Sequence, residues 1–379
     1  MTPARDIGLY VHVPFCRQRC HFCAFYLEIA RAERINAFRS ALTREIDLYR
    51  TQELLVERPL WSIYFGGGTP TALPPDTLVA LLGLIRATWP SNASMEVTVE
   101  AHPSTVTAEA LGVLAGAGFN RISIGAESMD ERDFGPIGRH GTVQDTQAAM
   151  TAARTAGFTN INLDLMYGLP GQSLESWVTT LRSLLTLEPV HVSCYALTIE
   201  EGTKLAHGMA RGAIPFPDEA LQIEMERAAE EILMTAGFER YEISNYAKPG
   251  FACRHNLLYW TDRDYLGLGP SAHSYVNGVR FGNVADLDIY IKQLKTDILP
   301  LSERTSLSAT EQRRDALVFG LRLLKGVPTS LLDSAVPGQE GRKILGNLTA
   351  KGLLTTENDR IRLTRLGRHY ADTVAGELF

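Results

Sequence analysis

The first half of the chain alternates short runs rich in Val, Ile, Leu and Tyr with longer helical patterns. The predicted strands are residues 9–13, 62–65, 95–99, 121–124, 161–165 and 191–195, and the predicted helices are residues 35–49, 75–88, 108–115, 143–156 and 173–187. In the second helix, Leu78, Leu81, Leu82 and Ile85 recur at the spacing of one buried face. Repeated βα alternation predicts a parallel sheet covered by helices, either doubly wound or curled into a barrel.

Composition narrows the class of protein. The 379 residues are 45% hydrophobic and 21% charged, as in a soluble globular chain of two or three domains. A net charge of -6 does not favour binding to nucleic acid. The longest apolar runs, such as 77–85, are shorter than the roughly 20 residues of a membrane span, so peripheral contact is the only membrane role left open. The first residues show no targeting pattern, which predicts a cytoplasmic protein.

Polar residues and glycines follow the predicted strands, where functional groups of parallel sheets collect. The segments at these strand ends are Cys16 after the first strand, Gly66-Gly67-Gly68-Thr69 after the second, Glu100 after the third, Glu127 after the fourth and Asp164 at the fifth. We therefore expect these residues to lie along one rim.

The second half has a different pattern. A predicted helix at 218–236 is followed by aromatic and polar loops with short strands through about residue 283. The last segment, 306–379, reads helix, helix, hairpin, helix. Helix 344–351 followed by a hairpin around Asn358-Asp359 is typical of a winged helix. The alternatives are a small packing domain, which the acidic charge favours, and a DNA-binding regulator, which a salt-sensitive gel shift would reveal.

Three of the five cysteines lie close together, in the pattern Cys16-x-x-x-Cys20-x-x-Cys23. A structural zinc site requires four ligands, and His12 or His21 could supply the fourth. A cubane iron–sulfur cluster held by three cysteines has one iron left open. The spacing therefore suits a cluster that binds a substrate or cofactor directly.

The run from Tyr10 to Cys23 resembles the signature of the radical S-adenosylmethionine (SAM) superfamily. The resemblance implies a 4Fe-4S cluster on Cys16, Cys20 and Cys23, with SAM bound at the open iron and cleaved to a deoxyadenosyl radical. By comparison with the coproporphyrinogen dehydrogenase branch, the residues implied to contact SAM are Tyr10, Gly66, Gly67, Gly68, Thr69, Glu100, Glu127, Arg139 and Asp164. For the charged residues the structural alternative is a salt bridge. Glu127 replaces the usual Gln of that branch, and His102 stands where Asn is common.

The resemblance extends over nearly the whole chain to the HemN-like group. It implies a partial (β/α)6 barrel with its cluster and SAM site in residues 1–211, a connecting α/β region in 212–300 and a C-terminal winged-helix-like domain in 301–379. Coproporphyrinogen dehydrogenases carry a further cysteine two positions after the third ligand and a longer N-terminal extension. This chain has Phe25 at that position, which argues against that activity.

The segment His255-Asn256-x-x-Tyr259-Trp260 is similar to the motif of the HemW haem chaperones within that group. It implies a monomer or dimer that binds haem through these residues and delivers it to an unidentified acceptor protein. Equally, the motif could be an aromatic segment that closes the barrel. Whether SAM is cleaved or only bound stays open.

A different class of protein is the alternative to a chaperone. Cys23-Ala24-Phe25-Tyr26 also resembles HemN-like methyltransferases and cyclopropanases, which use two SAM molecules. Formation of S-adenosylhomocysteine would favour such an enzyme.

Overall fold

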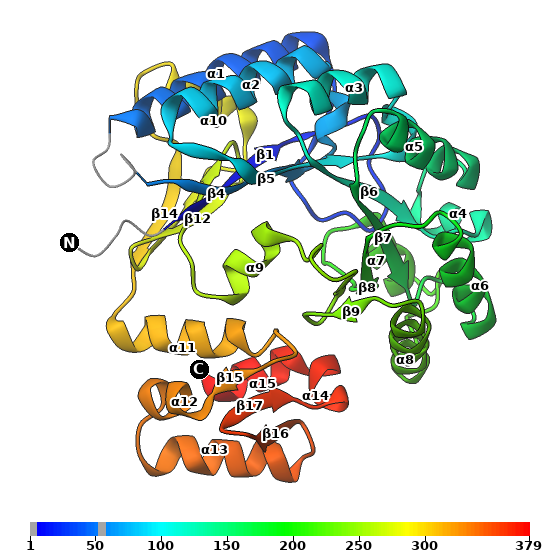
Figure 1. The fold of residues 1–379 in the computed structure, drawn as a ribbon, viewed down its shortest axis with the longest axis vertical. Helices are drawn as coiled ribbons and strands as arrows, with labels where there is room; N and C mark the ends of the chain where they lie inside the picture. The colour runs from blue at the N-terminus through cyan, green and yellow to red at the C-terminus, as the bar shows by residue number, and fades with distance from the viewer. Residues whose placement is uncertain (1–5, 52–57) are drawn as a thin grey trace.

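The computed structural model describes residues 6–51 and 58–379 (Figure 1). The start of the chain, where no targeting pattern is expected, lies outside the described residues. Six parallel neighbours form the centre of the main sheet: β1 (Ile7–Val13), β4 (Leu60–Gly67), β5 (Ser91–Ala101), β6 (Arg121–Glu127), β7 (Asn160–Tyr167) and β8 (His191–Ala196). All six predicted strands are confirmed, and the parallel sheet is the predicted one.

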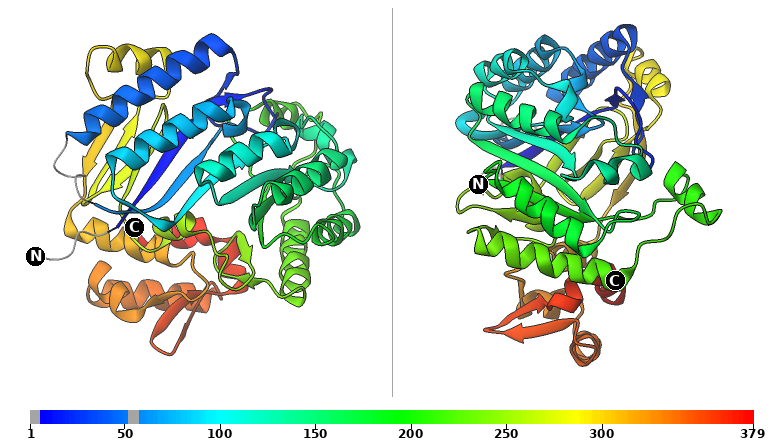
Figure 2. Two further views of the ribbon diagram at one scale, coloured as in Figure 1. Left: turned by 45° about the horizontal axis from the view of Figure 1, so that its top comes forward. Right: turned by 90° about the vertical axis from the view of Figure 1, so that its right-hand side faces the viewer.

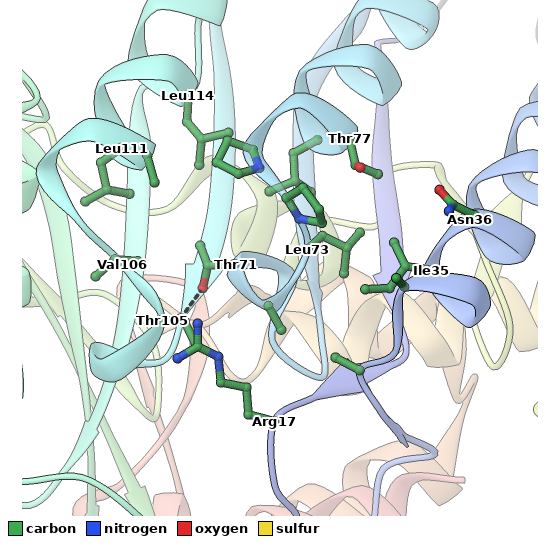
Figure 3. Close-up of a pocket in the computed structure, with 17 residues that line it drawn as sticks. Arg17, Ile35, Asn36, Thr71, Leu73, Thr77, Thr105, Val106, Leu111 and Leu114 are labelled. Atoms are coloured by element: carbon green, nitrogen blue, oxygen red, sulfur yellow. Dashed lines mark hydrogen bonds between the residues drawn. The ribbon is translucent and has the colours of Figure 1, made fainter.

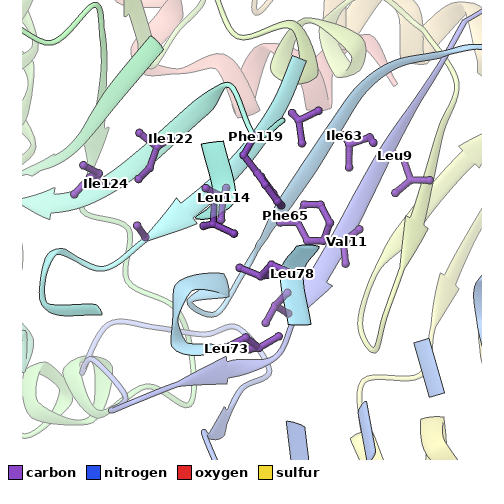
Figure 4. Close-up of a cluster of buried hydrophobic side chains, with 14 of the residues drawn as sticks. Leu9, Val11, Ile63, Phe65, Leu73, Leu78, Leu114, Phe119, Ile122 and Ile124 are labelled. Atoms are coloured by element: carbon purple, nitrogen blue, oxygen red, sulfur yellow. The ribbon is translucent and has the colours of Figure 1, made fainter. Parts of the chain in front are cut away.

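Helices cover the outer face of these strands (Figure 2). They are α1 (Ala32–Arg50), α2 (Pro75–Thr88), α3 (Ala108–Ala117), α5 (Val143–Thr155) and α6 (Leu174–Leu185). Figure 4 shows the resulting core, in which Val11 and Phe65 of the sheet face Leu78 of α2. Alternate strand residues point outward into this core, so the others point into the barrel.

Further strands extend the sheet on both sides of these six, and most of them pair antiparallel. On one side β11 (Tyr265–Leu268) runs parallel to β1 and continues antiparallel into β12 (His273–Val276), β13 (Val279–Asn283) and β14 (Leu301–Ser306). On the other side β8 pairs with β10 (Asn245–Ala247), which pairs with β9 (Glu239–Arg240). The predicted boundary at residue 300 assigns β14 to the C-terminal segment, whereas its hydrogen bonds join it to the main sheet.

The C-terminal segment has a separate hydrophobic core. Its elements are α11 (Ala309–Gly320), β15 (Val327–Pro328), α12 (Thr329–Ala335), α13 (Gln339–Ala350), β16 (Leu354–Glu357), β17 (Arg360–Leu363), α14 (Arg365–His369) and α15 (Ala371–Leu378). Asn358 and Asp359 join β16 to β17 with φ values of 49° and 58°, as a tight hairpin turn requires. The predicted helix and wing are thus confirmed. Arg368 donates two 3.0 Å hydrogen bonds to Glu230 of α8 (Glu219–Thr235), which fastens this segment to the barrel.

The remaining elements are short connections around the barrel: β2 (Phe15–Cys16), β3 (Glu28–Ile29), α4 (Phe134–Ile137), α7 (Lys204–Ala210), α9 (Arg254–Trp260) and α10 (Leu287–Leu294). Helix α9 lies between the strands and α11 (Figure 1). Within the described ranges, none of the helices is both long and apolar enough to cross a membrane.

Candidate functional site

The three clustered cysteines lie at the carboxyl end of β1. Cys16 ends β2, and its Sγ lies 3.4 Å from Oγ1 of Thr69, so the cysteine loop is tied to the segment that follows β4. Backbone hydrogen bonds also hold the loop, because His21 donates to Ile137 and accepts from Leu205. The loop is therefore a fixed part of the rim.

The thiols are suited to bind a positively charged centre. Burial raises the pKa of the Cys16 thiol to about 11 and also raises the pKa values of Cys20 and Cys23. Without a compensating cation these thiols are protonated at neutral pH, and ligation to a metal centre would displace their protons. The described part of the chain contains no group of three or more Cys, His, Asp or Glu side chains arranged around one metal ion. The three thiols are nevertheless the donor set that a 4Fe-4S cluster requires, because such a cluster takes one thiolate on each of three irons.

Neither histidine considered as a fourth ligand is placed for that role. His12 is buried, with Nδ1 3.2 Å from the hydroxyl of Tyr10 and Nε2 3.5 Å from the carbonyl of Tyr26. His21 has Nδ1 3.4 Å from the carbonyl of Pro136. Three thiols thus remain as the ligands that the loop offers.

Beside the loop lies a cavity of about 460 Å³, within the range of small-molecule sites. Of the residues predicted to contact SAM, it is lined by Gly68, Thr69, Glu100, Glu127, Arg139 and Asp164. Phe22 and Phe25, which flank Cys23 in the sequence, also line the cavity, so the cysteine loop borders it. Tyr64, Ser123 and Tyr195 also line it and were not singled out from the sequence, although each lies on the inward face of a predicted strand.

Three carboxylates of the cavity, those of Glu100, Glu127 and Asp164, are half-buried, and two of them accept hydrogen bonds. Glu100 accepts from the Tyr64 hydroxyl at 2.7 Å and from the backbone N–H of Gly67 at 3.1 Å. Asp164 accepts from Ser123 at 3.0 Å and from Asn162 at 2.8 Å. Burial raises the pKa of Glu100 to about 7, and it also raises the pKa values of Glu127 and Asp164. A cationic ligand would relieve this accumulation of negative charge.

Arg139 compensates the extra carboxylate at position 127. Its Nη1 lies 3.6 Å from Oε1 of Glu127, and it donates to the carbonyl of Gly125. Glu127 has a φ of 63°, and a register irregularity between Gly125 and Glu127 turns this side chain toward the cavity. The replacement of Gln by Glu is thus balanced within the site.

The three glycines are required by the protein's own packing. A Cβ on Gly67, whose φ is 107°, would lie 2.6 Å from the ring of His12. A Cβ on Gly68 would lie 2.6 Å from the carbonyl oxygen of Phe15, and one on Gly66 would meet Tyr64 at 2.9 Å. The glycines therefore allow the end of β4 to pack against the cysteine loop, and only Gly68 among them lines the cavity.

Tyr10 and His255 lie beneath the cavity, inside the barrel. Tyr10 stacks on Tyr64 and on His255, with ring centroids 6.2 Å apart in both pairs. His255 is 1% exposed, with Nδ1 2.9 Å from the hydroxyl of Ser62 and Nε2 3.0 Å from the hydroxyl of Tyr259. Burial lowers its pKa to about 3. Both ring nitrogens are engaged, so this arrangement favours the structural alternative over a haem ligand at His255.

The other motif residues also lie on α9, and none of them lines the cavity beside the cysteine loop. Tyr259 and Trp260 line a separate pocket of about 220 Å³ together with Phe319 of the C-terminal segment, and Arg322 stacks on Trp260. Asn256 is half-buried. The motif thus closes the inside of the barrel and joins it to α11.

Comparisons with known proteins place this geometry in a family. Residues 10–184 match the Radical SAM superfamily, and residues 307–370 match the HemN C-terminal domain. The chain is 33% identical to the heme chaperone HemW of Bacillus subtilis over 376 residues, which cover 97% of each chain. It is 34% identical to the heme chaperone HemW of Mycobacterium tuberculosis strain H37Rv, over 99% of this chain and 95% of that one. The chain belongs to the HemW family of radical SAM proteins.

Other relatives agree with this membership. The mitochondrial radical S-adenosyl methionine domain-containing protein 1 of Bos taurus is 34% identical over 84% of this chain and 74% of its own. The structure of coproporphyrinogen III oxidase (HemN) from Escherichia coli superposes with a TM-score of 0.85, covering 99% of this chain and 90% of that one, at 24% identity. At that identity the likeness concerns the fold, and it confirms the radical SAM barrel with its C-terminal domain.

Proposed function

We propose that this HemW family member is a haem chaperone that holds a 4Fe-4S cluster, binds SAM beside it and delivers haem to an acceptor protein. The observation that carries the proposal is the set of three thiols on one loop beside a cavity lined by carboxylates. The names of the relatives supply the haem-delivery part of the proposal. Cys16, Cys20 and Cys23 would hold the cluster, leaving one iron for SAM.

The charges of the cavity match those of SAM, which carries a sulfonium, an ammonium and a carboxylate. Glu100, Glu127 and Asp164 supply the negative groups, and Arg139 supplies a guanidinium that can pair with the methionyl carboxylate. Gly68 and Thr69 bring backbone groups to the cavity next to Cys16. A reduced cluster held by the three cysteines would be able to supply an electron to SAM, while the chain's own residues would orient SAM and limit access of water.

The first experiment is anaerobic reconstitution of the full chain, followed by haem titration. After reduction with SAM present, the same preparation is analysed by chromatography for deoxyadenosine and S-adenosylhomocysteine. We expect saturable haem binding without S-adenosylhomocysteine. Undetectable haem binding by protein with an intact cluster would reject the chaperone function. Formation of both SAM products without haem affinity would establish the methyltransferase or cyclopropanase alternative.

The cluster assignment has its own control. We expect Cys20→Ala to lose iron and acid-labile sulfide after reconstitution, because one of the three loop ligands is removed. Cys194→Ala is the matched control, since Cys194 lies in β8 with 5% exposure and packs in the main core. Equal iron content in the wild type and Cys20→Ala would reject the cluster on this loop.

A further inference from the structure

A second cavity, larger than the SAM cavity, lies between the N-terminal ends of α1, α2 and α3 (Figure 3). Its volume is about 550 Å³, against about 460 Å³ for the SAM cavity. Leu73, Leu78, Leu111 and Leu114 give it an apolar floor, and each of them is at most 3% exposed. We call this cavity the helix groove.

The helix groove adjoins the cysteine loop. Arg17, the residue after Cys16, lines it together with Thr105. Both residues also line a small pocket of about 40 Å³ that includes Cys20. Thr69 and His102 are shared between that small pocket and the SAM cavity. The helix groove, the cysteine loop and the SAM cavity therefore follow one another along the rim.

The electrostatic character of the helix groove is opposite to that of the SAM cavity. Its described lining residues include no carboxylate, and Arg17 supplies a guanidinium. Arg17 donates one hydrogen bond, at 2.9 Å, to the carbonyl of Ser104, so further N–H groups of its fork are available to an anion. In addition, α1 and α2 begin at the groove without a side-chain cap, and helix N-termini favour negative charge. Such a site fits a large apolar molecule that carries carboxylates.

We propose that the helix groove binds haem, with a propionate on Arg17 and the porphyrin ring against the partly exposed Ala72, Pro75 and Val106, which lie over the buried leucines. This inference rests on the proposed chaperone function and places its cargo. Among the described residues that line the groove, none is a His, Cys, Met or Tyr. The groove therefore recognises the ring and its carboxylates and contributes no iron ligand. A carrier of this kind leaves the iron free for the ligands of the acceptor.

The test is a titration of the reconstituted full chain with haem and, in parallel, with metal-free protoporphyrin IX. We expect the two to bind with similar affinity, because the groove does not ligate the iron. Ala110→Phe places a large side chain in the groove from α3, and Arg17→Glu reverses the charge at its edge. Each should weaken binding of both porphyrins by about tenfold or more, since ring contact or a charge-assisted hydrogen bond is lost. Ala108→Phe, at an exposed position of the same helix outside the groove, is the matched control.

The outcomes separate this inference from the proposed function. If the wild type binds no haem, the chaperone function itself is rejected. If haem binds equally to the wild type and Ala110→Phe, the chaperone survives and the groove is rejected. Tight haem binding without protoporphyrin binding would likewise reject the groove, because it would require an iron ligand. Iron and sulfide contents are measured for every variant. If Arg17→Glu loses the cluster, the groove is tested by Ala110→Phe alone.

Discussion

If SAM binds in this cavity as proposed, we expect the carboxylate of Glu100 to make that binding sensitive to pH. Burial raises its pKa to about 7, although the hydrogen bond from Tyr64 opposes the rise. As the pH falls below 7, the Glu100 carboxylate takes up a proton. A cationic ligand stabilises the ionised carboxylate, so its binding must displace that proton, and the affinity falls as the pH falls. With one such group, the affinity for SAM falls about fifteenfold between pH 7 and pH 5.5. The α-amino group of free SAM stays protonated over this range, since such groups titrate near pH 8. If that group binds the open iron, its proton is released equally in the wild type and in Glu100→Gln, so the comparison of the two isolates Glu100.

Equilibrium dialysis of SAM against the cluster-loaded protein at both pH values measures this effect. Glu100→Gln should bind SAM more weakly at pH 7. Its affinity should also lack the part of the pH dependence that arises from protonation of Glu100. Tyr64→Phe removes a hydrogen bond that lowers the pKa of Glu100, so the midpoint should move to higher pH. Wild-type affinity that does not change between pH 5.5 and pH 7 would refute the reasoning, as would an identical pH dependence in Glu100→Gln.

His255→Ala should lower stability by about 2–4 kcal/mol, because it opens a cavity and leaves the hydroxyls of Ser62 and Tyr259 without this partner. Urea unfolding measures the loss, and a haem affinity that drops while stability is unchanged would instead restore His255 as a haem contact. Gly68→Ala should reduce iron incorporation, because its Cβ would lie 2.6 Å from the carbonyl oxygen of Phe15 and displace the cysteine loop. Iron and sulfide analysis checks this, and wild-type cluster content would show that the loop can shift without cost.

Periodicity made the parallel strands and the rim predictable from the sequence. Each parallel strand is an apolar run followed by a turn, which the sequence shows directly. The carboxyl ends of parallel strands lie at the same edge of the sheet, so the residues that follow them are expected to lie close together. Short strands were expected after the helix at 218–236, but the pairing of β11–β14 with one another and with β1 was not predicted. These strands have little periodicity, and the partner of β11 is distant in the sequence.

The interior of the barrel was also not evident from the sequence. Tyr64 was recognised as a strand residue, but its contact with Glu100 depends on two neighbouring strands being in register. His255 illustrates the converse, because a histidine beside aromatic residues is equally typical of a ligand and of a buried hydrogen-bonded side chain. Only the positions of Ser62 and Tyr259 on both sides of its ring distinguish the two.

The position of β1 in the sheet has a consequence for biosynthesis. This strand leaves the ribosome long before β11, yet it lies between β4 and β11, and Gly8 pairs with Tyr265. One edge of β1 therefore has no native partner until most of the chain has been translated. Contacts so distant in sequence slow folding, and an open strand edge invites pairing with other chains. During its own synthesis this protein should thus depend on protection of the nascent chain.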